Sequence, residues 1–181
     1  LEVWIAWIER LQEWQRRRNA SIQNLDFPFD DFRDGQRHMA VAVYRAIRRE
    51  GRAMIQAPTG IGKTMAALFP SVKALGEALF AKIFYLTART TGRQAAQKAL
   101  AVLRDHGLHL KHLTLTAKDK ICPHPEAACT PEECPRARGH YDRLKQARAA
   151  AFEKDALDRE TVARLAETHT VCPFEVSLDM A

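Results

Sequence analysis

The stretch that decides the fold is Ala57-Pro58-Thr59-Gly60-Ile61-Gly62-Lys63-Thr64. It matches the phosphate-loop pattern G-x-x-x-x-G-K-[ST], except that alanine replaces the first glycine. The two glycines allow a tight turn whose backbone N–H groups can face phosphate oxygens. Lys63 would then reach the β- and γ-phosphates, and the Thr64 hydroxyl would bind Mg²⁺. The residues expected to bind the nucleotide here are Thr59, Gly60, Ile61, Gly62, Lys63 and Thr64.

Apolar runs and helical patterns alternate around this loop. Strands are expected at 53–57, 82–86 and 113–116. Helices are expected at about 34–50, 62–77 and 91–105, and Gly51 is the expected stop of the first. Strand, helix and strand in repetition predict an α/β fold, in which helices flank a parallel sheet.

Residues 1–18 form a separate amphipathic pattern. Trp4, Ile8, Leu11 and Trp14 recur at helical spacing between Glu and Arg. We interpret this segment as a packing helix. A connector from an upstream domain and a membrane-surface helix are the alternatives.

Composition limits the function classes. The 181 residues are 46% hydrophobic, which excludes a disordered or collagen-like chain. Lys and Arg number 28 against 22 Asp and Glu, and the net charge of +6 fits an anionic partner. We find no membrane span and no signal peptide, and we therefore expect a cytoplasmic protein. The chain starts at Leu1 rather than Met, so we expect a piece of a longer protein.

Four cysteines mark a second region. Cys122, Cys129, Cys134 and Cys172 are separated by six, four and 37 residues. Four thiolates suit zinc or an iron–sulfur cluster, although the short zinc spacing occurs only once, and four unrelated buried thiols remain an alternative. Pro173 can occupy the first position of a helix, which would place the Cys172 thiolate beside free helix N–H groups.

Together these features resemble the XPD/DinG-like iron–sulfur DNA helicases of superfamily 2, over about residues 27–181. The phosphate loop is similar to that family's motif I, where alanine at the first position is common. Phe27-Pro28-Phe29, with Arg33 and Gln36, is similar to its adenine-sensing element. The resemblance implies that Gln36 bonds the adenine edge and that Phe29 or Arg33 shapes the base pocket. Without the family, Gln36 would be an exposed polar residue of a helix.

The same resemblance assigns DNA and cluster residues. Thr87, Arg89 and Thr90 are similar to motif Ia, which contacts the DNA backbone; the alternative is a polar loop with a helix cap at Thr90 or Thr91. Cys172-Pro173-Phe174 is similar to the segment that carries the last ligand of the family's 4Fe–4S cluster. The resemblance, rather than the spacing, favours iron–sulfur over zinc. The implied ligands are Cys122, Cys129, Cys134 and Cys172.

The resemblance also implies an organisation and an activity. The amphipathic pattern predicts an N-terminal helix and linker at 1–26. The resemblance implies part of a RecA-like, ATP-binding P-loop NTPase motor domain at 27–117, a cluster insert at 118–172 and the start of a further helix at 173–181. The parent protein would use ATP and Mg²⁺ to move 5′-to-3′ on single-stranded DNA and to open forks, with DNA repair as the family's expected role. A second motor domain would follow in the same chain, and an upstream nuclease domain is an open alternative.

Two observations set limits on this interpretation. No Asp-Glu pair follows an apolar strand, so we expect this chain alone to bind nucleotide weakly and to hydrolyse it negligibly. The basic residues after Cys134, including Arg138 and Arg143, could follow a DNA backbone or could simply form a solvated helix face. The stripe comprises Arg136, Arg138, Arg143, Lys145 and Arg148.

Two other function classes compete with the helicase. One is a non-enzymatic nucleic-acid-binding module with a zinc Cys₄ site and a degenerate phosphate loop. The other is a small P-loop kinase, which we rank last because no lid or acceptor motif is visible.

Overall fold

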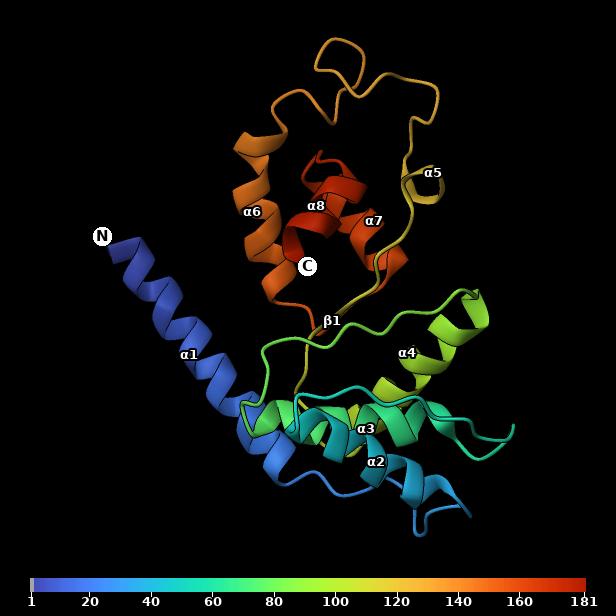
Figure 1. Ribbon diagram of the computed structural model, residues 1–181. Helices are drawn as coiled ribbons and strands as arrows, with labels where there is room; N and C mark the ends of the chain where they lie inside the picture. Colours follow the sequence, from blue (N-terminus) through green and yellow to red (C-terminus); the bar gives the residue numbers. More distant parts are fainter. Residues whose placement is uncertain (1) are drawn as a thin grey trace. The chain divides into compact units, whose positions relative to one another are not determined.

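The computed structural model describes residues 2–181 and divides into two compact units (Figure 1). The first unit ends at His109 and the second comprises Leu110–Ala181. The helices of the first unit are α1 (Glu2–Gln23), α2 (Gln36–Arg48), α3 (Lys63–Gly76) and α4 (Thr90–Asp105). The elements of the second are β1 (His112–Leu113), α5 (Lys118–Ile121), α6 (His140–Phe152), β2 (Ala156–Leu157), α7 (Arg159–Thr168) and α8 (Pro173–Met180).

Helix α3 is the centre of the first unit and packs against α1, α2 and α4. A helix that is apolar on most of its faces is stable only when neighbours cover it. The buried apolar side chains of α3 are Met65, Ala66, Leu68, Val72, Ala74 and Leu75. At its end, Gly76 lets Ile22 of α1 lie directly against the backbone, since a Cβ at position 76 would overlap the Ile22 side chain. The core therefore fixes the helix that starts at the phosphate loop.

The contact between α1 and α3 lies at the C-terminal end of α1. Lys73 of α3 donates hydrogen bonds to the carbonyls of Ile22, Gln23 and Leu25, at 2.9, 3.2 and 3.0 Å. The last carbonyls of a helix have no partner within the helix, so a lysine ammonium there is stabilising. The sequence predicted packing through the tryptophan-bearing stripe instead. Within residues 2–181, Trp4 is 74% exposed, and Ile22 is the buried residue of α1.

The three predicted helices of this unit are confirmed, but α2 ends differently from the prediction. Glu50, rather than Gly51, takes the left-handed conformation, with φ of 51°. The N–H of Gly51 donates to the Ala46 carbonyl at 2.9 Å, and the N–H of Glu50 donates to the Ile47 carbonyl at 2.9 Å. This pair of bonds is a Schellman motif in which glycine stands one position after the left-handed residue.

Two of the three predicted strands are not formed. Residues 53–57 and 82–86 are neither helix nor paired strand, and no strand within residues 2–181 pairs with them. A helix satisfies its own backbone hydrogen bonds, whereas a strand needs a neighbouring segment. The third prediction is met in part, because β1 pairs in parallel with β2, His112 opposite Ala156 and Leu113 opposite Leu157. The parallel sheet of a P-loop NTPase stays a prediction.

The second unit has its own small core. Ala147 and Ala151 of α6 allow close approach of neighbouring helices, and Val162 and Val176 fill the space between them. Helix α7 is capped by Asp158, whose carboxylate accepts from the Thr161 N–H at 2.8 Å. That hydrogen bond lowers the pKa of Asp158 below its ordinary value. The sequence pattern also predicts helical segments near 137–152 and 159–168, and these are found as α6 and α7.

No helix within residues 2–181 combines the length and the apolar character needed to cross a bilayer.

Candidate functional site

The phosphate loop has the backbone that its glycines predicted. Gly60 and Gly62 both have positive φ, 90° and 79°, and α3 begins at the next residue, Lys63. The first N–H groups of a helix have no acceptor within the helix, and the helix dipole places partial positive charge there. The predicted turn and helix start are confirmed. Nucleotide binding by this loop stays a prediction.

Lys63 and Thr64 stand at the start of α3. The Lys63 side chain is exposed, and its Nζ donates to the carbonyls of Pro58 at 2.8 Å and Ala57 at 3.3 Å. The ammonium therefore lies over its own loop rather than in the protein interior. Neutral carbonyls are weaker partners for an ammonium than phosphate oxygens are, so an arriving phosphate could displace them.

Gln36, predicted to bond the adenine edge, and Arg33, one of the two residues predicted to shape the base pocket, both contact the phosphate loop. Gln36 is 3% exposed; its Oε1 accepts from the Arg33 N–H at 3.0 Å and its Nε2 donates to the Gly62 carbonyl at 3.3 Å. The Arg33 guanidinium donates to the Gly60 carbonyl at 2.5 Å. Gln36 is therefore not an exposed helix residue. Phe29 is 52% exposed and meets Phe27 edge-on.

Gly62 offers a direct test of this arrangement. A Cβ at position 62 would overlap the Gln36 amide, whereas a Cβ at Gly60 would meet nothing within 4 Å. Both positions have positive φ, so alanine at either one costs about 1 kcal/mol in backbone strain. We expect Gly62→Ala to destabilise the first unit by about 1–3 kcal/mol more than Gly60→Ala, because Gln36 must move. Hydrogen exchange of the α2 and α3 amides measures the difference. Equal protection in the two variants would contradict the contact.

The residues that resemble motif Ia lie at the start of α4. The Thr87 hydroxyl accepts from the Arg89 N–H at 3.4 Å and donates to the Arg89 carbonyl at 3.3 Å. Thr87, Arg89 and Thr90 are exposed, and no side chain caps this helix, so the alternative of a threonine cap is wrong. The exposed hydroxyls and guanidinium remain accessible to a phosphate backbone.

The cysteines of the second unit differ in burial, and two of them line one cavity. Cys129 is exposed, Cys122 and Cys172 are half-buried, and Cys134 is buried. Cys122 and Cys129 line a cavity of about 460 Å³ together with Lys118. The Cys129 sulfur raises the pKa of Lys118 above its ordinary value, and the charges of Cys122 and Cys172 add to the shift. Two of the four thiols therefore lie beside one ammonium.

Cys172 has the environment that its sequence predicted. It is the N-cap of α8, with Pro173 at the first helical position. Burial raises the pKa of its thiol, and the nearby backbone N–H groups of Phe174 and Glu175 oppose this shift only in part. These N–H groups would favour a thiolate once a cation compensates for burial.

The thiols match an iron–sulfur or zinc site in number and kind, but their geometry is not that of an assembled site. Within residues 2–181, no three His, Cys, Asp or Glu side chains are arranged to hold a metal ion. Lys118 lines the same cavity as Cys122 and Cys129, where its positive charge would compete with a bound cation. The ligand set of Cys122, Cys129, Cys134 and Cys172 stays a prediction.

Arg143 connects the loop after Cys134 to the segment before Cys172. Its guanidinium donates to the carbonyls of Thr170 at 2.6 Å, Arg138 at 2.6 Å and Pro135 at 3.3 Å. Arg136 makes a second connection, to the carbonyls of Ala166 at 2.7 Å and Val171 at 3.2 Å. Thr170 has a positive φ of 52°, which these contacts help to hold.

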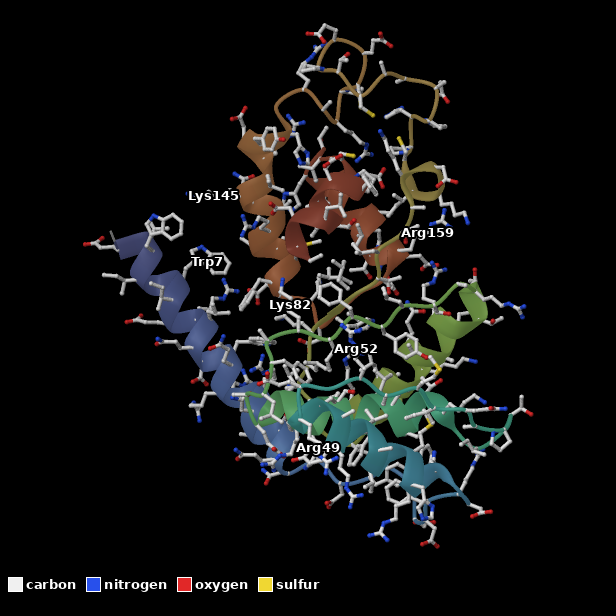
Figure 2. All side chains as sticks on the ribbon, in the orientation of Figure 1. Trp7, Arg49, Arg52, Lys82, Lys145 and Arg159 are labelled. Carbon is white, nitrogen blue, oxygen red and sulfur yellow. The ribbon has the colours of Figure 1, made fainter. Side chains whose placement is uncertain are left out.

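The rest of the basic stripe has mixed partners. Arg138 donates to the Pro131 carbonyl at 3.0 Å, and Arg148 pairs with Asp179 at 3.2 Å. Lys145 is exposed and lies on the side of α6 away from α7 and α8 (Figure 2). The stripe therefore consists mostly of arginines that hold backbone carbonyls, so neither a fully free DNA surface nor a merely solvated face describes it.

Sequence reasoning missed Lys118, the bridging role of Arg143 and the buried position of His140. His140 is 6% exposed, and its Nδ1 lies 3.2 Å from the Cys172 N–H, which it accepts. Burial lowers its pKa, in keeping with the neutral ring that this acceptor role requires. Of these three residues, only Lys118 lies within one helical turn of a candidate ligand in the sequence, four positions before Cys122.

One short stretch of the chain is similar to a known protein. A stretch of 46 residues is 35% identical to a probable ATP-dependent helicase of Methanocaldococcus jannaschii. The match covers 25% of this chain and 7% of that protein, so the chain spans a small part of its relative. No family model matches the chain. No solved structure matches it. The chain thus carries a helicase-like stretch.

Loss of the Arg143 bridge should expose the thiol loop. We expect Arg143→Ala to raise the reactivity of Cys134 toward a thiol reagent by about tenfold, because a guanidinium that holds several carbonyls is replaced by a methyl group. Arg143→Lys should restore only part of the protection, since an ammonium cannot fork between carbonyls. Lys145→Ala on the same helix is the matched control. Equal reactivity in the Arg143 and Lys145 variants would show that the bridge does not hold the loop.

Proposed function

We propose that this chain is part of the first motor domain of an ATP-driven DNA helicase that carries an iron–sulfur cluster. The observation that supports the ATP-binding half is the junction of loop and helix. The left-handed turn at Gly60 and Gly62 runs into α3, and Lys63 and Thr64 occupy the first turn of that helix. The similarity to a probable ATP-dependent helicase supports the class of enzyme.

In this proposal Lys63 and the loop N–H groups bind the β- and γ-phosphates of ATP, and the Thr64 hydroxyl binds Mg²⁺. Arg33 and Gln36 donate hydrogen bonds to the carbonyls of Gly60 and Gly62. A shift of the loop on nucleotide binding would therefore move the start of α2. We retain Gln36 as the contact to the adenine edge, and this role requires its amide to exchange at least one of its present partners. The step of hydrolysis needs carboxylates and arginines supplied by the rest of the parent protein.

For the second unit we propose a 4Fe–4S cluster held by Cys122, Cys129, Cys134 and Cys172. The cluster would supply a rigid anchor for the loops that meet a DNA fork. The support lies in the cavity that Cys122 and Cys129 share and in the helix start at which Cys172 stands. Binding would require Lys118 to move from its present place. A zinc site in the same thiols, within a non-enzymatic nucleic-acid-binding module, is the competing assignment.

We further propose that the parent protein travels 5′-to-3′ on single-stranded DNA and that Thr87, Arg89 and Thr90 of the first unit contact the DNA backbone. Arg138 of the second unit is a further proposed DNA contact. Arg143 contributes in this proposal mainly by holding the loop that carries Arg138. A second motor domain in the same chain would close on ATP, and repair of DNA is the expected setting.

The central test is Lys63→Ala in the full-length parent protein. We expect the variant to lose ATP-dependent unwinding by at least about a hundredfold, since the ammonium that meets the transferred phosphoryl group is gone. Fork unwinding measured by fluorescence reports the loss. Lys98→Ala, an exposed lysine of α4, is the matched control and should retain full activity. Unwinding that survives in the Lys63 variant would refute the assignment of this loop.

Colour distinguishes the two metal assignments. An anaerobic preparation of the parent should be brown, with broad absorption near about 400 nm, and should contain iron and labile sulfide. Replacing Cys172 with Ser should bleach it. A colourless preparation with one equivalent of zinc would overturn the iron–sulfur proposal in favour of the zinc module.

A further inference from the structure

A groove of about 650 Å³ lies between α2 and α3. These helices run in the same direction, because Gln36 meets Gly62 at their beginnings and Tyr44 meets Glu77 near their ends. The floor of the groove is apolar and includes Val41 and Pro70, of which Val41 is 39% exposed. A cavity of this size with an apolar floor is typical of a ligand or side-chain pocket.

The rim of the groove carries an excess of positive charge. Its arginines are Arg37, Arg45, Arg48 and Arg49, all exposed; Figure 2 labels Arg49. The one acidic residue of the lining, Glu77, accepts from the Tyr44 hydroxyl at 2.7 Å, and within residues 2–181 it forms no ion pair with these arginines. Within residues 2–181, the side chains of Arg37, Arg45 and Arg49 make neither an ion pair nor a hydrogen bond.

The aromatic rings beside the groove are unsuited to nucleic-acid bases. Phe27 stacks on Phe32 with centroids 3.8 Å apart, and it meets Phe69 at an angle of 82°. The three rings thus form a cluster among themselves. Single-stranded nucleic acid is usually held by open aromatic faces on which bases stack. An apolar floor beneath unpaired cations instead favours an apolar side chain flanked by carboxylates.

We propose that this groove binds an acidic peptide segment of a partner protein, with leucine or phenylalanine side chains on the floor and carboxylates on the arginines. Helices and short peptides dock in this way when their apolar side chains recur every three or four residues. Arg45 and Arg49 lie one helical turn apart on α2 and would contact successive carboxylates. The site makes no use of the phosphate loop or the thiols, so it is independent of the proposed helicase activity.

The probe is a fluorescein-labelled peptide of Asp, Glu and Leu, with Leu at every third or fourth position. We expect the full chain to bind it with a Kd of about 10 µM and with strong dependence on salt. The double variant Arg45→Glu, Arg49→Glu and the single variant Val41→Asp should each weaken binding by at least about tenfold. Lys98→Glu is the charge-matched control on α4, and Lys63→Ala should bind the peptide normally. Circular dichroism confirms that each variant is folded.

The competing outcome is nucleic acid in the same groove. A labelled oligo-dT that binds more tightly than the peptide, and that weakens in the same three substitutions, would overturn the proposal. It would also be overturned if the peptide fails to bind, or if a version with every Leu replaced by Ser binds equally well, because the apolar floor would then play no part. If the parent protein lacks ATPase activity while this chain still binds the peptide, the helicase proposal fails and the peptide-binding proposal stands.

Discussion

The left-handed backbone of Gly62 is the constraint on which the first unit depends. It turns the chain so that α3 starts at Lys63, and it leaves room for the Gln36 amide, which bonds the Gly62 carbonyl. The same helix then continues into the core and ends beside Ile22 and the carbonyls that Lys73 holds. A single residue without a side chain thus joins an exposed loop to the most buried helix of the unit.

Sequence patterns predicted the helices well and the strands poorly, for a physical reason. The helical spacing of apolar residues in α2, α3 and α4 can be recognised in the sequence because a helix makes its hydrogen bonds between residues close in the chain. The runs at 53–57 and 82–86 have the composition of buried strands, but pairing depends on segments distant in sequence. The end of α2 shows a similar limit. The sequence placed the end of the helix near Gly51 correctly, but the residue with the left-handed backbone is Glu50, one position earlier.

Part of the candidate site followed from short motifs, and part did not. The turn at Gly60 and Gly62 and the position of Cys172 at a helix start depend on neighbouring residues, so the sequence contained the signal. The bridge from Arg143 to Thr170 spans 27 positions, and the contact from Gln36 to Gly62 spans 26. No local pattern encodes such contacts. Arginine appears in a sequence as charge for an external partner, whereas here several guanidinium groups are used to hold the protein's own carbonyls.

The unpaired runs have a practical consequence for the isolated polypeptide. Met54 is fully exposed, Leu86 is 88% exposed and Phe84 is 69% exposed, on backbone that no β-ladder covers. Exposed apolar residues beside unsatisfied amides are the features that seed intermolecular cross-β assembly. Purified on its own, this polypeptide should therefore precipitate as concentration rises, and fusion to a highly charged carrier or co-expression with segments that add strands should keep it dispersed.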